Sequence, residues 1–71
     1  MSNISKVKVE IVPGKLLELK IPKGYSVWDL LLELKINPEE VIVLREGIPV
    51  TEEEEVRDGD YLQVIRVASG G

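Results

Sequence analysis

The chain has 71 residues, of which 44% are hydrophobic and 31% are charged, and this composition suits one compact globular domain. Cysteine and histidine are both absent, which excludes disulfides, thiol nucleophiles, zinc-finger sites and the usual acid–base group of neutral pH. The net charge of −4 argues against nucleic-acid binding through phosphate neutralisation. Because no apolar stretch approaches the roughly 20 residues of a membrane-spanning helix, we expect a cytoplasmic protein without membrane contact. We also expect a monomer, and with Cys and His absent we expect neither a metal site nor catalytic residues.

Two β-strands joined by a tight turn are predicted near the start of the chain. Apolar residues alternate with charged or other residues in two runs, Val7, Val9 and Ile11 and then Leu17, Leu19 and Ile21. A period of two is typical of strands with one buried face. Between the runs, Pro13 fixes φ and Gly14 tolerates positive φ, so a hairpin is expected.

A helix is predicted next, because apolar residues then recur at i, i+3, i+4 and i+7, namely Val27, Leu30, Leu31 and Leu34. Ser26 and Asp29 have the spacing of a capping box at its start. Asn37-Pro38 is expected to end the helix after about three turns, because a residue before proline avoids helical backbone angles.

Three further strands are predicted after the helix. Residues 41–44 (VIVL) are expected to form a continuous buried strand, and 48–50 (IPV) a short edge strand. A turn at 58–60 (DGD) then leads into a final strand over 61–67 (YLQVIRV). This order predicts an α+β fold with a mixed sheet of four to five strands and one main helix packed on one face.

In this element order, and in the ending DGDYLQVIRVASGG, the chain resembles the ThiS/MoaD sulfur carriers of the ubiquitin-like β-grasp superfamily. It is similar as well to the small archaeal ubiquitin-like modifiers. The resemblance implies a β-grasp domain over residues 1–67 and a flexible tail over residues 68–71.

The resemblance also implies a chemical role for the carboxylate of Gly71. In such proteins an E1-like adenylating enzyme activates the terminal glycine with ATP and Mg²⁺, and the carrier itself binds no cofactor. Gly70 suits a narrow channel because it has no Cβ. The activated glycine either becomes a thiocarboxylate for thiamine, molybdopterin or tRNA thiolation, or is joined to a lysine of a target protein. A thiazole synthase and the large subunit of molybdopterin synthase are therefore implied partners, and both routes stay open.

Several surface residues allow a functional and a structural interpretation. Since one helix covers only one sheet face, outward residues of the last strand either are ordinary exposed groups or dock the activating enzyme, together with the start of the tail. These docking candidates are Tyr61, Gln63, Ile65, Val67, Ala68 and Ser69.

Two other features favour structural roles. Trp28 and Leu32 are expected to pack at the rim of the core, with contact with a partner as the alternative. The acidic run 52–55 is expected to be a solvated turn, with attraction to a basic enzyme surface as the alternative. The alternative to a carrier is a non-covalent β-grasp binding module whose tail has no chemistry.

Overall fold

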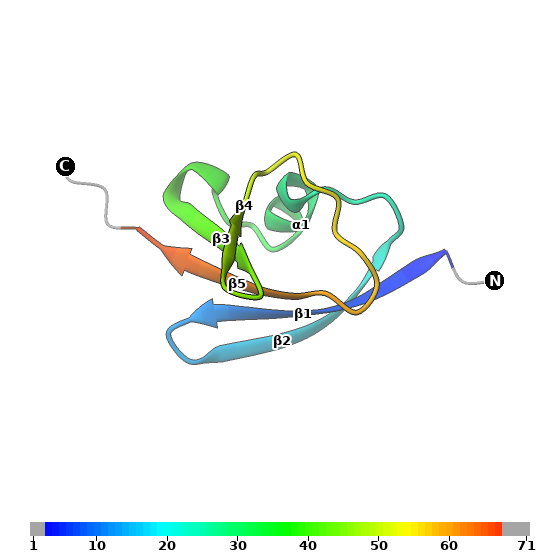
Figure 1. The fold of residues 1–71 in the computed structure, drawn as a ribbon, viewed down its shortest axis with the longest axis horizontal. Helices are drawn as coiled ribbons and strands as arrows, with labels where there is room; N and C mark the ends of the chain where they lie inside the picture. Colours follow the sequence, from blue (N-terminus) through cyan, green and yellow to red (C-terminus); the bar gives the residue numbers. More distant parts are fainter. Residues whose placement is uncertain (1–2, 68–71) are drawn as a thin grey trace.

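The structure, a computed structural model, describes residues 3–67 and confirms the predicted α+β class (Figure 1). Its sheet has the strand order β2-β1-β5-β3-β4, in which β1 and β5 are parallel and the other pairs antiparallel. The helix α1 covers one face of this sheet (Figure 1). The elements in chain order are β1 (Ile4–Val12), β2 (Lys15–Pro22), α1 (Val27–Glu33), the 3₁₀ turn η1 (Pro38–Glu40), β3 (Val41–Arg45), β4 (Ile48–Val50) and β5 (Tyr61–Arg66).

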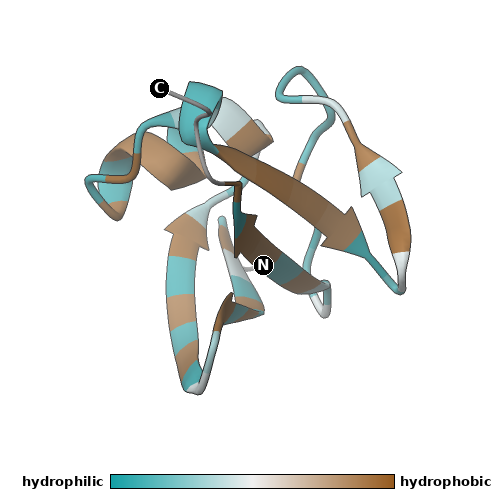
Figure 2. Ribbon diagram, turned by 90° about the vertical axis from the view of Figure 1, so that its left-hand side faces the viewer, coloured by the Kyte–Doolittle hydropathy of each residue, from teal (hydrophilic) through white to brown (hydrophobic). Residues whose placement is uncertain are grey.

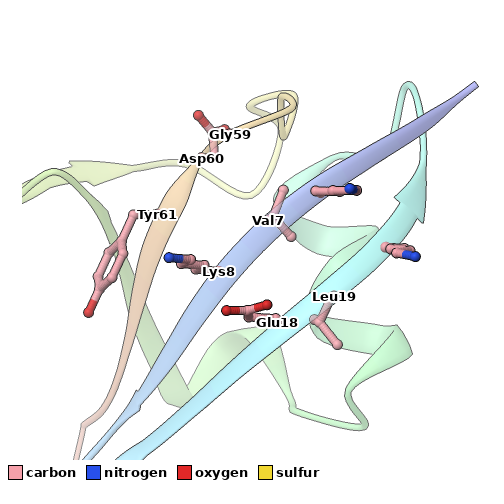
Figure 3. A pocket seen from close by; sticks show the side chains of 9 residues that line it. Val7, Lys8, Glu18, Leu19, Gly59, Asp60 and Tyr61 are labelled. Carbon is pink, nitrogen blue, oxygen red and sulfur yellow. The ribbon is translucent and has the colours of Figure 1, made fainter. Parts of the chain in front are cut away.

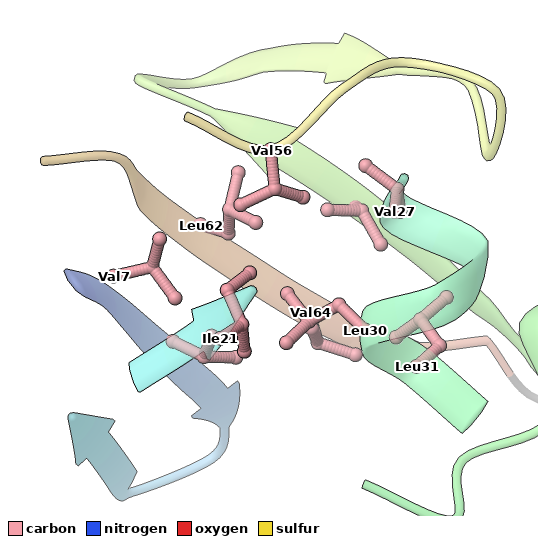
Figure 4. Packing of buried hydrophobic residues seen from close by; sticks show 10 residues of the cluster. Val7, Ile21, Val27, Leu30, Leu31, Val56, Leu62 and Val64 are labelled. Carbon is pink, nitrogen blue, oxygen red and sulfur yellow. The ribbon is translucent and has the colours of Figure 1, made fainter. Parts of the chain in front are cut away.

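The core lies between the sheet and α1, and β5 runs through its middle (Figure 4). Figure 2 shows the alternation of hydrophobic and hydrophilic residues along the hairpin, which places one set of side chains against the helix. Leu62 of β5 and Val9 of β1 are both 0% exposed. Val56 also reaches the core from the loop between β4 and β5, although no periodic pattern in the sequence marks it.

The predicted capping box at the start of α1 is confirmed. The Asp29 backbone N–H donates to Ser26 Oγ over 3.1 Å, and the Ser26 backbone N–H donates to Asp29 Oδ2 over 3.1 Å. The backbone N–H groups of Val27 and Trp28, at the first two helix positions, donate to carbonyls of the acidic loop 52–55. Val27 donates to Glu54 and Trp28 donates to Glu52. The side chains of residues 52–55 are exposed, as predicted for a solvated turn. The backbone of this turn has a second role that was not predicted, because it caps the start of α1.

The predicted length of α1 and the reason given for its end are wrong. The helix has seven residues, and Lys35 follows its C-cap in the left-handed region at φ 60°. Lys35 N–H donates to the carbonyl of Leu32 and Ile36 N–H to that of Leu31, which is the Schellman pattern. Pro38 instead opens η1, and Asn37 Oδ1 accepts from Glu39 N–H over 3.0 Å as its cap.

Replacing Lys35 by glycine should therefore stabilise the protein. A non-glycine residue is strained at φ 60°, and relief of that strain outweighs the extra freedom of glycine in the unfolded chain. We expect the free energy of unfolding in urea to rise by about 0.5 kcal/mol. The matched control is Glu33→Gly inside the helix, which should lower the free energy of unfolding by about 0.5–1 kcal/mol. A lower free energy of unfolding in both variants would contradict this explanation of the helix end.

Two other expectations about burial are wrong. In β3 only Val43 is buried, and Ile42 is 45% exposed, because the helix covers one face of the sheet and neighbouring residues alternate between the two faces. Trp28 and Leu32 do not pack at the rim of the core, since they are 41% and 52% exposed on the outer flank of α1.

Arg45 on β3 holds the loop that precedes β5. Its Nη2 donates to the carbonyl of Glu55 over 2.7 Å and to Asp60 Oδ2 over 3.0 Å, and Nη1 lies 3.7 Å from Glu54. Asp60 Oδ2 also accepts from the Arg57 N–H over 2.8 Å. These contacts fix the turn at 58–60 and so the point at which β5 begins.

Candidate functional site

The chain leaves the sheet at the end of β5, beside the turn that joins β1 and β2 (Figure 1). Arg66 pairs with Val41 of β3, and the next backbone N–H, that of Val67, donates to the Glu40 carbonyl over 2.9 Å. This is the last point at which the described chain is fastened to the fold. Four predicted site residues lie outside the described residues, and their roles stay predictions: Ala68, Ser69, Gly70 and Gly71.

The outward residues of β5 form the middle of the sheet face that α1 does not cover. Leu62 and Val64 are buried towards the helix, so Tyr61, Gln63 and Ile65 occupy the opposite face. Tyr61 is 39% exposed, and Gln63 and Ile65 are partly buried. The structure thus brings three of the predicted docking residues onto one face, and the fourth, Val67, is 39% exposed where the chain leaves it.

Ile65 is the centre of an apolar cluster near that exit. It pairs directly with Val12 of β1 on one side and with Ile42 of β3 on the other. We use the name apolar half for the outward residues of this part of the sheet, which are Val12, Leu16, Ile42, Leu44 and Ile65. Leu16 and Ile42 are exposed and the other three are half-buried. Contiguous apolar surface of this kind is typical of a protein docking site.

Glu10 of β1 organises the polar side chains next to the apolar half. Its Oε1 accepts hydrogen bonds from Tyr61 Oη over 2.8 Å and from Gln63 Nε2 over 3.1 Å. The bond from Tyr61, followed by the bond from Gln63, lowers the pKa of Glu10, because both favour the carboxylate. The same bond raises the pKa of Tyr61, since it favours the protonated phenol.

Replacing Glu10 by glutamine should lower the pKa of Tyr61 towards its ordinary value of about 10. The Glu10–Tyr61 contact stabilises the fold between two limits: it is lost as the pH falls through the lowered pKa of Glu10 and as it rises through the raised pKa of Tyr61. An NMR titration of the Tyr61 ring measures the shift. Glu18→Gln, which removes another carboxylate of this face, is the control, and an unchanged Tyr61 pKa in Glu10→Gln would contradict the assignment.

Two kinds of feature are absent from the part of the chain that the structure describes. Within residues 3–67 no group of three or more Asp or Glu side chains is placed to hold a metal ion, and no helix is long and apolar enough to span a membrane. Three members of the face, Glu10, Val12 and Ile42, were not predicted from the sequence. Only strand register brings them beside β5, and no local pattern in the sequence marks that register.

Solved structures show which class of protein this arrangement defines. A ubiquitin of Caldiarchaeum subterraneum superposes with a TM-score of 0.71 at 23% identity, covering 96% of this chain and 99% of its own. A putative molybdopterin converting factor subunit 1 of Pyrococcus furiosus gives 0.75 at 24% identity, covering 90% and 99%. The protein therefore has the ubiquitin-like β-grasp fold, as predicted.

Sequence relatives define the family within that fold. The family model for small archaeal modifier protein 2 matches residues 5–68, and the chain belongs to this family. Small archaeal modifier protein 2 of Haloferax volcanii is 34% identical over 65 residues, which cover 92% of this chain and 97% of the relative. The sulfur carrier protein TtuB of Thermus thermophilus is 37% identical over 54 residues, covering 76% and 83%. The predicted resemblance to sulfur carriers and archaeal modifiers is thereby confirmed.

Proposed function

We propose that this chain is a ubiquitin-like carrier whose Gly71 carboxylate is activated by an E1-like adenylating enzyme in the cytoplasm. The observation that carries the proposal is its membership of a family whose named relatives include a sulfur carrier and a protein modifier. The chain is then a substrate of that enzyme and has no catalytic residues of its own.

The geometry of β5 supports this role. Four of its six residues, 62–65, are paired with both β1 and β3, and the sequence continues past Val67 to Gly70 and Gly71. An adenylating enzyme that binds the apolar half around Ile65 therefore contacts the fold next to residues 68–71. These residues must enter the nucleotide site of the enzyme. Docking on a rigid sheet lowers the entropy cost of positioning the carboxylate.

The chemistry begins with an ionised carboxylate, because an α-carboxyl group has a pKa of roughly 3.5 and is a poor electrophile at neutral pH. A carboxylate oxygen of Gly71 attacks the α-phosphorus of ATP and pyrophosphate leaves, with Mg²⁺ held by the enzyme. A persulfide sulfur can then attack the carbonyl carbon and displace AMP, after which a thiol cleaves the S–S bond and leaves a thiocarboxylate. Alternatively, a lysine amine displaces AMP, directly or after transfer to a thiol, loses a proton and forms an isopeptide bond.

Both outcomes are compatible with the relatives, since one is named a sulfur carrier and the other a modifier. The thiocarboxylate would supply a thiazole synthase, a molybdopterin synthase large subunit or a tRNA-thiolating enzyme. The isopeptide would mark lysines of target proteins. We propose that the activation step is shared and that the acceptor decides between the two routes.

The test is the intact mass of the protein purified from its native cells without added thiols, together with a search of cellular proteins for Gly-Gly remnants on lysine. A gain of roughly 16 Da that fragmentation places at the carboxyl group of Gly71, from exchange of oxygen for sulfur, identifies a sulfur carrier. Oxidation of Met1 adds the same nominal mass at the other end of the chain and is told apart in this way. Remnants traced to this chain identify a modifier, and both signals identify a dual role. An unmodified mass with no remnants would overturn the proposal in favour of a non-covalent binding module.

A further inference from the structure

Three of the six lysines of this acidic chain gather at the end of the uncovered sheet face that lies away from the tail. Lys6 and Lys8 of β1 and Lys20 of β2 line a hollow of about 550 Å³, together with Glu18 and Tyr61. Figure 3 shows the Lys8 side chain between those of Tyr61 and Glu18. We call Lys6, Lys8 and Lys20 the lysine cluster.

The lysine cluster carries an excess of positive charge within the hollow. The carboxylates of Glu18 and Asp60 also line it, but that of Asp60 is bound by Arg45 over 3.0 Å. Lys6 and Lys20 are direct cross-strand partners, a like-charge arrangement that destabilises a sheet. Lys8 pairs across the strands with Glu18, but among residues 3–67 none of the three lysines forms an ion pair. In a chain with a net charge of −4, this concentration of unpaired positive charge is not a consequence of composition.

Protection of a sheet edge does not explain the lysine cluster. Lysines on edge strands prevent pairing with other chains, and β2 is an edge strand, so that explanation suffices for Lys20. Lys6 and Lys8, however, lie on β1, which is paired on both sides, with β2 and with β5. Their positive charges are therefore available to a ligand on the open face.

The size of the face indicates that one partner contacts both its ends. Five strands about 4.8 Å apart make it roughly 24 Å wide, and the six residues of β5 make it roughly 20 Å long. Its area of roughly 500 Å² is smaller than the ~800 Å² that one partner covers in a standard interface. Lys8 pairs with Tyr61, four residues before Ile65, or about 13 Å along β5. A protein seated on the apolar half thus extends over the lysine cluster.

We infer that the lysine cluster receives an acidic segment of the enzyme that activates Gly71, an inference that rests on the proposed function. Carboxylates of that segment pair with Lys6, Lys8 and Lys20, while the apolar half binds apolar side chains of the same enzyme. Nucleic acid fits this surface less well, because the apolar half beside the lysine cluster offers nothing to a phosphate backbone but suits the apolar side chains of a protein. The charge pairs fix the orientation of the carrier and speed its association.

The experiment compares two double variants of the full chain in ATP–pyrophosphate exchange with the adenylating enzyme of the same organism. Lys8→Gln with Lys20→Glu alters the lysine cluster, and Lys15→Glu with Lys35→Gln makes the same change in charge at two lysines outside the hollow. We expect KM for the cluster variant to rise about tenfold near 50 mM NaCl and about twofold near 500 mM, with kcat unchanged. The control variant should stay within about twofold of the wild type.

The Tm of the cluster variant checks for misfolding. Lys20→Glu places opposite charges across from each other at Lys6 and offsets the Lys8–Glu18 pair that Lys8→Gln removes, so Tm should stay close to the wild-type value. An unchanged KM in the cluster variant, or an equal rise in the control, overturns the inference and leaves the proposed function standing. Absence of exchange with the wild-type chain overturns the proposed function itself. RNA binding that the cluster substitutions abolish would assign these lysines to nucleic acid and overturn the inference as well.

Discussion

Deletion of Gly71 should lower adenylation of this chain at least 100-fold without changing its thermal stability. The shortened chain still ends in a glycine carboxylate, but that carboxylate lies one residue, or about 3.5 Å, short of its position in the full chain. Near-attack geometry is lost with displacements of about 1 Å, so a shift of this size removes most of the rate. ATP–pyrophosphate exchange with the adenylating enzyme measures the loss.

Gly70→Ala tests the same chemistry by adding a single methyl group. The added Cβ limits the backbone angles of residue 70 and widens the segment that approaches the nucleotide, so exchange should fall while the carboxylate keeps its position. Far-UV circular dichroism and Tm serve as the controls, because the last described hydrogen bond to the fold is made by Val67. Full exchange activity in both the deletion and Gly70→Ala would mean that the tail has no part in activation.

Leu62→Ala should remove about half of the stability of the domain. Leu62 is 0% exposed and faces the helix from the central strand β5, so truncation leaves a cavity that its neighbours fill only in part. Such substitutions cost about 2–5 kcal/mol. A chain of 71 residues has a total stability of roughly 4–10 kcal/mol, so the loss is expected to be about half of the total.

Leu32→Ala is the matched control, because the same change is made at a helix position that is 52% exposed. Its free energy of unfolding should change by about 0.5 kcal/mol or less. Urea unfolding followed by circular dichroism compares the two variants. Equal losses at the two positions would contradict the assignment of Leu62 to the core and of Leu32 to the surface.

The element order was predictable because each segment carries a clear period or turn signal. The alternation around Val7 and Leu19, the stripe from Val27 and the glycine turn before Tyr61 are all local patterns, and the structure confirms the elements they predict. Helix length was not predictable in the same way. Its end depends on Lys35 taking a left-handed conformation that usually requires glycine, so the ordinary signal is missing from the sequence.

The candidate site was predictable along the strand and not across it. Alternation on the last strand separates Leu62 and Val64 from Ile65, and this separation needs only the period of two. The neighbours Val12 and Ile42 join Ile65 through parallel pairing with β1 and antiparallel pairing with β3, and these long-range registers leave no mark in local sequence. The residues 68–71 lie outside the described structure, so their roles and the boundary between domain and tail stay predictions.

The most direct test of activation at Gly71 is to incubate the full chain with its adenylating enzyme and ATP labelled at the α-phosphate, and to locate the label by mass spectrometry. We predict an adenylyl group on the carboxyl group of Gly71, which is lost with release of AMP when a sulfur or amine nucleophile is added. A chain that gains no adenylyl group under conditions in which the enzyme is active, or gains it at another residue, would contradict the account.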